Sequence, residues 1–285
     1  MKVELVNIKT EDSFFLDGIY ASANSTPNSS SIDAFLLVHG TYGNFYNPGL
    51  LDITEKLIES GFAVASFNTR AHDVISRSKR SDSFEISGTA LEYLDDSIQD
   101  LDACVKWLTE IGHERIAILG VSMGAVKVIY YQSNKQNPSV KAIIAVSPVR
   151  LSKSFYLGSE ASEPYKAYHK QASLMVQLGK PEGLINIEDE IVPGQGIFGA
   201  AAYLDKYGSE KYNIVNYAQN ISDPLLIMSG SLETHPRLID CAKDAYNSLT
   251  EGNKGKLVVI EGGDHSLRNI GPRLPKIIIE WIDSI

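Results

Sequence analysis

The sequence predicts an α/β fold, in which a mostly parallel sheet has helices on both faces and one long insertion. Three observations predict it. Short apolar runs alternate along the chain with segments of helical spacing, which is the pattern of repeated strand–helix–strand units. Several runs are apolar at every position, as strands are when both faces of their sheet are covered. The alternation stops after residue 150 and resumes at about residue 223, which indicates inserted chain.

The strands before the insertion begin with a pair of neighbouring segments that we expect to form a hairpin, residues 2–10 and 14–22. Buried apolar runs follow at 34–38, 62–67, 115–120 and 142–146. Helices are expected between them, where apolar residues recur at helical spacing. They cover residues 50–60, 94–111 and 123–133. Gly61 and Gly112 end the first two of these helices, because glycine adopts the left-handed conformation at a helix end.

The segments after the insertion repeat this pattern. Strands are expected at 224–228 and 256–260, and helices at 236–249 and 272–284. Residues 1–150 and 223–285 are therefore expected to form one core, and residues 151–222 an inserted cap. The cap holds half of the fourteen tyrosines of the chain. Tyrosine offers a flat apolar face with a polar tip, so these rings are expected either to bind an aromatic acyl group or to pack between cap and core.

The composition is that of an ordinary globular protein, with 44% hydrophobic and 21% charged residues among 285. The net charge of −9 argues against nucleic-acid binding, which needs clustered Lys and Arg. No apolar run is long enough to span a membrane, and the charged N-terminus is unlike a signal peptide. We therefore expect a cytoplasmic protein without nucleic-acid or membrane partners. Its two cysteines, Cys104 and Cys241, are expected to be reduced packing residues.

A G-x-S-x-G sequence, Gly120-Val121-Ser122-Met123-Gly124, lies at the junction of an expected strand and an expected helix. The small glycines permit the tight turn that presents a serine hydroxyl at the edge of a sheet. The alternative is an ordinary glycine-rich turn. The position of the motif favours a catalytic role for Ser122.

A nucleophilic serine needs a base, and six histidines compete for that role. We expect it to be His265, because it follows the last strand. The carboxyl ends of parallel strands meet at the edge of the sheet where ligands bind. The alternative is a loop histidine with a surface hydrogen bond. The other five histidines are His39, His72, His113, His169 and His235.

The carboxylate that would orient the imidazole is expected to be Glu233, which lies just after the strand at 224–228. Asp223 precedes that strand and so lies at the wrong edge, and Asp264 adjoins the histidine. A solvated loop carboxylate is the alternative reading of Glu233. Two backbone N–H groups are expected to stabilise an oxyanion. Met123 would supply one, and Thr41 the other, with Tyr42 as an alternative to Thr41.

These residues together resemble the α/β-hydrolase superfamily. The resemblance rests on His39-Gly40, the G-x-S-x-G sequence, the Gly230-to-Glu233 loop and Asp264-His265, and it covers residues 30–150 and 223–285. It implies an eight-stranded sheet, a Ser-acid-His triad and no cofactor or metal. The chain departs from many members in having valine at 121 and glutamate as the acid.

Two further sites are expected to be structural. Arg70-Ala71-His72-Asp73 occupies the place of a frequent Arg-Gly-His-Gly run of the superfamily, and the alternative is that His72 or Asp73 lines the pocket. Lys127 is expected to be a solvated or snorkelling side chain. For the substrate pocket we expect Tyr42, Tyr156 and Tyr203.

The expected function is a serine hydrolase that cleaves a carboxylic ester or lactone of a small to medium hydrophobic or aromatic acyl compound. A thioesterase, amidase or acyltransferase with the same triad is an alternative, because one fold hosts many chemistries. A non-catalytic ligand-binding protein is a further alternative, which an intact triad disfavours. Epoxide hydrolases and haloalkane dehalogenases of this fold have Asp at the elbow, so Ser122 argues against them. The partner is a small-molecule ester, and a homodimer stays open as the state of assembly.

Overall fold

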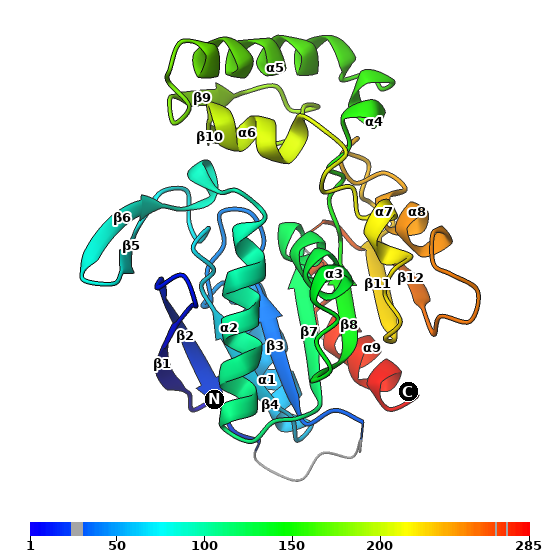
Figure 1. Ribbon diagram of the computed structural model, residues 1–285. Coiled ribbons are helices and arrows are strands. Elements are labelled where there is room, and N and C mark those ends of the chain that lie inside the picture. Colours follow the sequence, from blue (N-terminus) through cyan, green and yellow to red (C-terminus); the bar gives the residue numbers. More distant parts are fainter. Residues whose placement is uncertain (24–30, 266, 272) are drawn as a thin grey trace.

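An eight-stranded sheet forms the centre of the molecule (Figure 1). The computed structural model describes residues 1–23, 31–265, 267–271 and 273–285. Across the sheet the order is β1-β2-β4-β3-β7-β8-β11-β12. The strands are β1 (Glu4–Lys9), β2 (Phe15–Ala21), β3 (Ala34–Val38), β4 (Ala63–Phe67), β7 (Ile116–Val121), β8 (Val140–Val146), β11 (Leu225–Gly230) and β12 (Lys256–Ile260).

Only β2 runs opposite to the other strands of this sheet. It pairs antiparallel with β1 and β4, whereas the pairs from β4 to β12 are parallel. This confirms the mostly parallel, eight-stranded sheet and the hairpin expected at its start. The carboxyl ends of β3, β7, β8, β11 and β12 therefore meet at one edge of the sheet.

Each face of the sheet has its own hydrophobic core, because successive side chains of a strand point to opposite faces. In β3, Leu36 packs into one core and Phe35 into the other. The first core includes α2 (Asp96–Glu110), α3 (Met123–Lys135) and α8 (Cys241–Asn247), and the second includes α1 (Pro48–Glu59) and α9 (Arg273–Ile282). Both cysteines, Cys104 of α2 and Cys241 of α8, are unpaired thiols buried in the first core. Coverage of both faces explains why β3 is apolar at every position.

Helix boundaries differ from the sequence prediction where capping or loops decide them. Helix α1 begins at Pro48, two residues before the predicted start, because the Asn47 side chain accepts a hydrogen bond from the Gly49 N–H at 3.1 Å and proline suits the first helical position. Helix α8 begins only at Cys241, whereas residue 236 was predicted. Residues 231–240 instead form a loop at the carboxyl edge of the sheet, and this loop carries Glu233.

Two short hairpins were not predicted. One pairs β5 (Ser76–Arg80) with β6 (Ser83–Ser87), and the other pairs β9 (Leu184–Ile187) with β10 (Gly196–Gly199). Strand β5 consists only of serine, lysine and arginine, so it lacks the apolar run that signals a strand. The strands of the second hairpin have four residues each, too few to show an alternation clearly.

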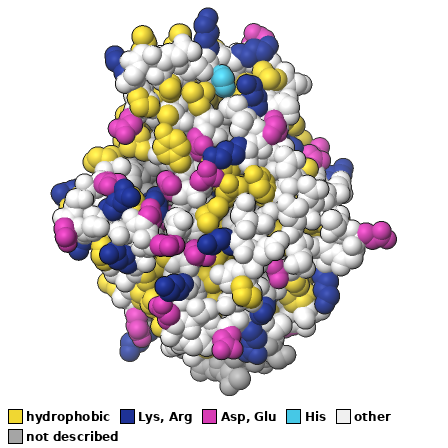
Figure 2. All heavy atoms as spheres, in the orientation of Figure 1, with side chains coloured by type: hydrophobic (Ala, Val, Ile, Leu, Met, Phe, Trp, Pro, Cys, Tyr) yellow, Lys and Arg dark blue, Asp and Glu magenta, His cyan; other side chains and the backbone are white. Residues whose placement is uncertain are grey.

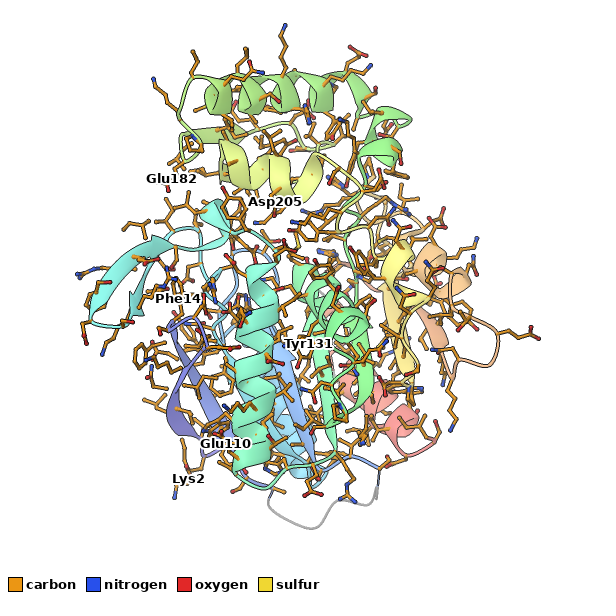
Figure 3. The ribbon with its side chains drawn as sticks, viewed as in Figure 1. Lys2, Phe14, Glu110, Tyr131, Glu182 and Asp205 are labelled. Carbon is orange, nitrogen blue, oxygen red and sulfur yellow. The ribbon has the colours of Figure 1, made fainter. Side chains whose placement is uncertain are left out.

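The chain between β8 and β11 leaves the sheet and forms a separate layer, which we call the insertion (residues 151–222). It contains α4 (Lys153–Leu157), α5 (Ser162–Gln177), the β9–β10 hairpin, α6 (Ala200–Tyr207) and α7 (Val215–Ala218). Figure 1 shows α5, α6 and the hairpin beyond the carboxyl ends of the strands. Asp205, on the side of α6 that faces the core in Figure 3, accepts a hydrogen bond from the Leu94 N–H at 3.1 Å. The insertion therefore lies over the edge where a site is expected.

The surface of the molecule mixes charged and hydrophobic side chains, and hydrophobic ones are visible on the insertion in Figure 2. Leu174, Leu178 and Leu184 are among the exposed hydrophobic residues there. Within the described residues, no helix has both the length and the apolar character needed to cross a lipid bilayer.

Candidate active site

Ser122 lies in a sharp turn between β7 and α3. Its φ of 58° is left-handed, a conformation that costs energy in a residue other than glycine. The two flanking residues, Gly120 and Gly124, must be glycine because there is no room for a side chain at either position. A Cβ on Gly120 would come within 2.1 Å of the Gly124 carbonyl oxygen, and one on Gly124 within 2.3 Å of the Val38 carbonyl oxygen. The G-x-S-x-G sequence is therefore the sequence that this turn requires, and it holds the serine hydroxyl at the carboxyl edge of the sheet.

His265 reaches the serine from the loop after β12. Its Nε2 lies 3.0 Å from Ser122 Oγ, which is hydrogen-bond distance, although the two residues are 143 positions apart in the sequence. The imidazole is partly exposed, with 27% of its surface accessible. The structure therefore brings together the hydroxyl and the imidazole that the sequence singled out.

Glu233 lies beside the same imidazole, but its hydrogen bonds are to other residues. Its Oε1 is 3.9 Å from His265 Nδ1, which is beyond hydrogen-bond distance. The same oxygen accepts hydrogen bonds from Ser147 Oγ at 2.5 Å and from the Gly230 N–H at 3.1 Å. His265 Nδ1 is buried and has no partner among the described residues. A shift of about 1 Å would complete a Ser-His-Glu chain, and such bonds are often long in an unliganded site.

Ser147 is a residue of this site that the sequence analysis missed. It directly follows β8, is fully buried, and has a left-handed φ of 49°. Its N–H donates to the Met228 carbonyl of the neighbouring strand at 2.7 Å. The backbone thus fixes the hydroxyl that holds Glu233. No local sequence signal marks Ser147, because its partner is 86 residues away.

Two backbone N–H groups were expected to stabilise an oxyanion, those of Met123 and Thr41. Met123 is the first residue of α3, and its N–H has no acceptor among the described residues. The same holds for the N–H of Thr41, whereas that of Tyr42 donates to Thr89 Oγ1 at 3.1 Å. This bond favours Thr41 over Tyr42 as the second donor. A Cβ on the neighbouring Gly40 would lie 2.9 Å from the Ser122 Cβ, so only glycine allows this loop to approach the serine so closely.

A cavity of about 790 Å³ opens beside Ser122 and His265. It is lined by the 39–43 loop, the elbow, α1, α9, the insertion and the loop after β11. From the insertion come Gly194, Gln195 and Tyr207, and the Tyr42 hydroxyl donates to the Gln195 carbonyl at 3.0 Å. A volume of this size suits a small organic ligand.

Of the three tyrosines expected to line the pocket, only Tyr42 does so. Tyr156 and Tyr203 have no accessible surface and do not line the cavity. The hydroxyl of Tyr156 donates to the Arg150 carbonyl at 2.8 Å, and the Tyr203 ring packs against that of Tyr207. These two rings therefore pack inside the protein, which corrects the expectation, and Tyr207 is the lining tyrosine that the sequence analysis did not single out.

Lys127 is not solvated, contrary to expectation. It is 1% exposed and forms an ion pair at 2.6 Å with Glu92, which is also buried. Lys206 of α6 pairs with the other Glu92 oxygen at 2.8 Å. Burial opposes ionisation of Glu92, but the two ammonium groups outweigh it and lower its pKa to about 2. Lys127 Nζ also donates to Thr69 Oγ1 at 3.2 Å. This buried cluster of three charges joins α3 to the insertion.

His39 stands at the other end of that network. Its Nε2 accepts a hydrogen bond from the Thr69 N–H at 3.1 Å. Burial, and then the charge of Lys127, lowers the pKa of His39 to about 3, so its imidazole is neutral in the folded protein. His39 thus supports the 39–43 loop, and none of its hydrogen bonds among the described residues is to Ser122.

The run Arg70-Ala71-His72-Asp73 is held by ion pairs outside the cavity. Arg70 pairs with Asp100 at 2.8 Å and with Asp12 at 2.7 Å, and His72 Nδ1 lies 2.8 Å from Asp73. Neither His72 nor Asp73 lines the cavity beside Ser122. In the part of the chain that the structure describes, no group of three or more His, Cys, Asp and Glu is placed to hold a metal ion.

The model of the alpha/beta hydrolase fold family matches residues 33–188, more than half of the sequence. The chain belongs to the α/β hydrolase family. A comparison with curated proteins finds no match.

Solved structures share the fold of this α/β hydrolase at low sequence identity. An alpha/beta hydrolase from Penicillium, GrgF, is 16% identical with a TM-score of 0.73, over 99% of this chain and 97% of that one. The esterase Pf2001 of Pyrococcus furiosus is 20% identical with a TM-score of 0.65, over 99% and 92%. Est1E of Butyrivibrio proteoclasticus is 14% identical with a TM-score of 0.61, over 98% and 96%.

Proposed function

We propose that this α/β hydrolase is a serine esterase. Its substrate would be a carboxylic ester, or a lactone, of a small to medium hydrophobic or aromatic acyl compound. One observation carries the proposal: Ser122 Oγ lies 3.0 Å from His265 Nε2, at the wall of a cavity of about 790 Å³. A hydroxyl becomes a nucleophile when a base is in hydrogen-bond reach.

The reaction would begin when His265 Nε2 takes the proton of Ser122 Oγ and the oxygen attacks the ester carbonyl carbon. The carbonyl oxygen becomes negative and accepts hydrogen bonds from the N–H groups of Met123 and Thr41. His265 then gives its proton to the departing alcohol, and an acyl-serine remains. Water, deprotonated by His265, attacks the acyl carbon and frees the acid and the serine.

Glu233 is the third member of the proposed triad. Its carboxylate would accept the His265 Nδ1–H and stabilise the imidazolium that forms while the serine proton is held. The 3.9 Å separation means that the loop after β11 or the imidazole must move slightly when substrate binds. The bonds from Ser147 and Gly230 keep the carboxylate near this position.

The insertion would act as a cap that helps to shape the acyl pocket. Gly194, Gln195 and Tyr207 of the insertion line the cavity, as do Leu50 and Leu274 of the core. The mixture of apolar side chains and a few polar groups suits a hydrophobic or aromatic acyl group. Two neighbours in fold agree with this, since one is an esterase of Pyrococcus furiosus and Est1E has been solved with ferulic acid bound.

The proposal is tested with a chromogenic short-chain ester and a fluorophosphonate probe. Wild type should hydrolyse the ester and be labelled at Ser122. Ser122→Ala should lose both properties, with turnover reduced by at least about 10⁴-fold because the nucleophile is gone. Ser133→Ala, in the same helix and outside the cavity, is the matched control and should keep both. Undiminished turnover by Ser122→Ala would refute the assignment. If a thioester or an amide of the same acyl group is cleaved faster than the ester, the protein is a thioesterase or an amidase instead.

A further inference from the structure

Arg237 lines the same cavity as Ser122 and His265. It lies four residues after Glu233, in the loop that joins β11 to α8, and the sequence analysis assigned it no role. A positively charged side chain in the wall of a largely apolar pocket is costly unless something compensates its charge. What surrounds the guanidinium therefore decides what it does.

The backbone around Arg237 is fixed from both sides. Its N–H donates to His235 Nδ1 at 3.0 Å, and its carbonyl accepts a bond from the Arg150 N–H at 2.7 Å. Pro236 before it restricts the chain further, since the proline ring fixes φ. His235 Nε2 is in turn bonded to the Glu190 carbonyl of the insertion. The base of the side chain is thus held in place, as a specificity-determining residue requires.

Among the described residues, the charge of Arg237 has no acidic partner. Its Nε is buried and makes no hydrogen bond to any described residue, and no carboxylate of the described residues lies within ion-pair distance of the guanidinium. Arg70 and Arg150 differ in this respect. Arg70 pairs with Asp12 and Asp100, and Arg150 pairs with Asp244.

The groups nearest to Arg237 do not neutralise it. Burial, followed by the charge of Arg237, lowers the pKa of His235, so that this imidazole is uncharged at neutral pH. Tyr42 is also close enough to feel the charge; burial raises its pKa to about 12, so it too is neutral. Three consecutive acids lie in the insertion, Glu188-Asp189-Glu190. Glu188 and Glu190 are exposed to solvent, and Asp189 accepts a hydrogen bond from the Ile191 N–H at 3.2 Å.

Among the described residues, the other Asp, Glu and Lys side chains that line the cavity lie on α1. Asp52, Glu55 and Lys56 are all exposed there, and Lys56 is bonded to Glu59 at 2.7 Å. Water screens charges in such positions. Arg237 is therefore the cavity-lining cation, within the described residues, that is both partly buried and without an acid.

From this we infer that Arg237 binds an ionised carboxylate of the substrate, so that the preferred ester carries a free carboxylate on its acyl part. The inference rests on the proposed esterase reaction and replaces the purely hydrophobic acyl group by one that ends in a carboxylate, as in monoesters of dicarboxylic acids. A guanidinium presents paired donors that match the two oxygens of a carboxylate, and the bonds gain strength when both groups carry charge. The carboxylate would pair with the part of the guanidinium that the cavity exposes and would compensate its charge, while Ser122 attacks the ester carbonyl at the other end of the acyl chain.

The experiment compares two esters with the same leaving group: mono-para-nitrophenyl glutarate, which ends in a carboxylate, and para-nitrophenyl pentanoate, which is neutral and of equal chain length. Wild type should prefer the glutarate in kcat/KM by about 10- to 100-fold, the range for hydrogen bonds between charged groups. Arg237→Gln should lose that preference. Lys276→Gln, which removes a charge of the same sign from the exposed side of α9 outside the cavity, is the matched control and should retain it.

The outcomes separate the inference from the proposed function. If wild type cleaves the neutral ester but shows no preference, or if Arg237→Gln keeps the preference, the inference is overturned and the esterase stands. If wild type cleaves neither ester and the fluorophosphonate leaves Ser122 unlabelled, the proposed function fails and the inference fails with it.

A second measurement uses wild type alone, in case Arg237→Gln does not fold. Glutarate and glutaramide have the same length, but only glutarate is charged. Glutarate should slow fluorophosphonate labelling of Ser122 at concentrations where glutaramide has no effect. Equal protection by the two compounds, or none by either, would contradict the role of Arg237.

Discussion

At the scale of single residues, the position of the Glu233 carboxylate depends on Ser147. The Ser147 hydroxyl holds Glu233 Oε1 at 2.5 Å, while the imidazole that the carboxylate would serve is 3.9 Å away. Among the described residues, Ser147 forms no hydrogen bond with Ser122 or His265, so it is a positioning residue that acts through Glu233.

Ser147→Ala should therefore affect the catalytic step more than binding. We expect kcat to fall about tenfold and KM to change less than about twofold, because the carboxylate loses one of its two described donors and orients the imidazole less well. Steady-state kinetics on a chromogenic ester check this. A purely structural role would instead lower the folded fraction and leave the kcat of the remaining folded enzyme unchanged.

The residues of this site differ in how visible they were in the sequence. Ser122 and His265 could be predicted, because a local motif marks the first and its place after the last strand marks the second. Ser147 and Arg237 could not. Ser147 matters because folding brings it to Glu233, and Arg237 matters because folding leaves it without an acidic partner among the described residues. The spacing of residues in the sequence encodes neither fact. Tyr156 and Tyr203 were misjudged because composition cannot tell a ring that faces a cavity from one that is packed.

At the scale of elements, the cluster of Lys127, Glu92 and Lys206 joins three of them. Lys127 is on α3, Lys206 is on α6 of the insertion, and Glu92 follows the short 3₁₀ helix η1 (Thr89–Leu91). The Lys206 ammonium also donates to the Thr89 carbonyl at 2.8 Å. The insertion thus contacts the core beside the 39–43 loop, since Thr89 Oγ1 accepts the bond from the Tyr42 N–H.

Replacing the anion, Glu92, should lower the free energy of unfolding more than replacing one of the cations, Lys206. Glu92→Gln leaves two buried ammonium groups facing each other, and we expect the free energy of unfolding to fall by about 3–5 kcal/mol. Lys206→Met leaves a neutral Lys127–Glu92 pair and should cost less. Urea denaturation of the two variants and of wild type measures the difference. Equal losses would contradict this account of the cluster.

The elements themselves were predicted unevenly, for a physical reason. The central strands and α1, α2 and α3 could be predicted because burial on a sheet imposes a regular apolar pattern. The hairpins β5–β6 and β9–β10 could not, because their strands are short and partly exposed. Lys127 was misread for a related reason. A lysine in a helix is usually solvated, and the acid that pairs with it is 35 positions earlier in the chain.

At the scale of the whole molecule, the two cores on either side of the sheet enclose several ionisable groups whose charge state is tied to folding. His39 is 1% exposed, and its folded pKa of about 3 lies below its ordinary value of 6.5. Between these two values the unfolded chain binds the proton and the folded chain does not. Stability from this group is therefore present above pH 6.5 and is lost as the pH falls toward about 3.

His39→Gln should remove this part of the pH dependence. On going from about pH 7 to about pH 5, wild type should lose about 2 kcal/mol more free energy of unfolding than the variant. Urea denaturation at both pH values measures it. At both pH values Glu92 of the folded protein stays ionised, because the neighbouring ammonium groups hold its pKa at about 2. The same slope in both proteins would show that His39 is not the group responsible.

The two thiols of the first core have a practical consequence. Burial raises the pKa of Cys104 well above its ordinary value and that of Cys241 to about 12, so neither forms the thiolate that reacts with electrophiles. The native enzyme can therefore be handled without a reducing agent and should ignore maleimides. A cysteine introduced on the exposed side of α5, as in Lys170→Cys, would then be the sole position to accept a fluorophore. This variant would place a spectroscopic reporter on the insertion without removing any native residue of the core.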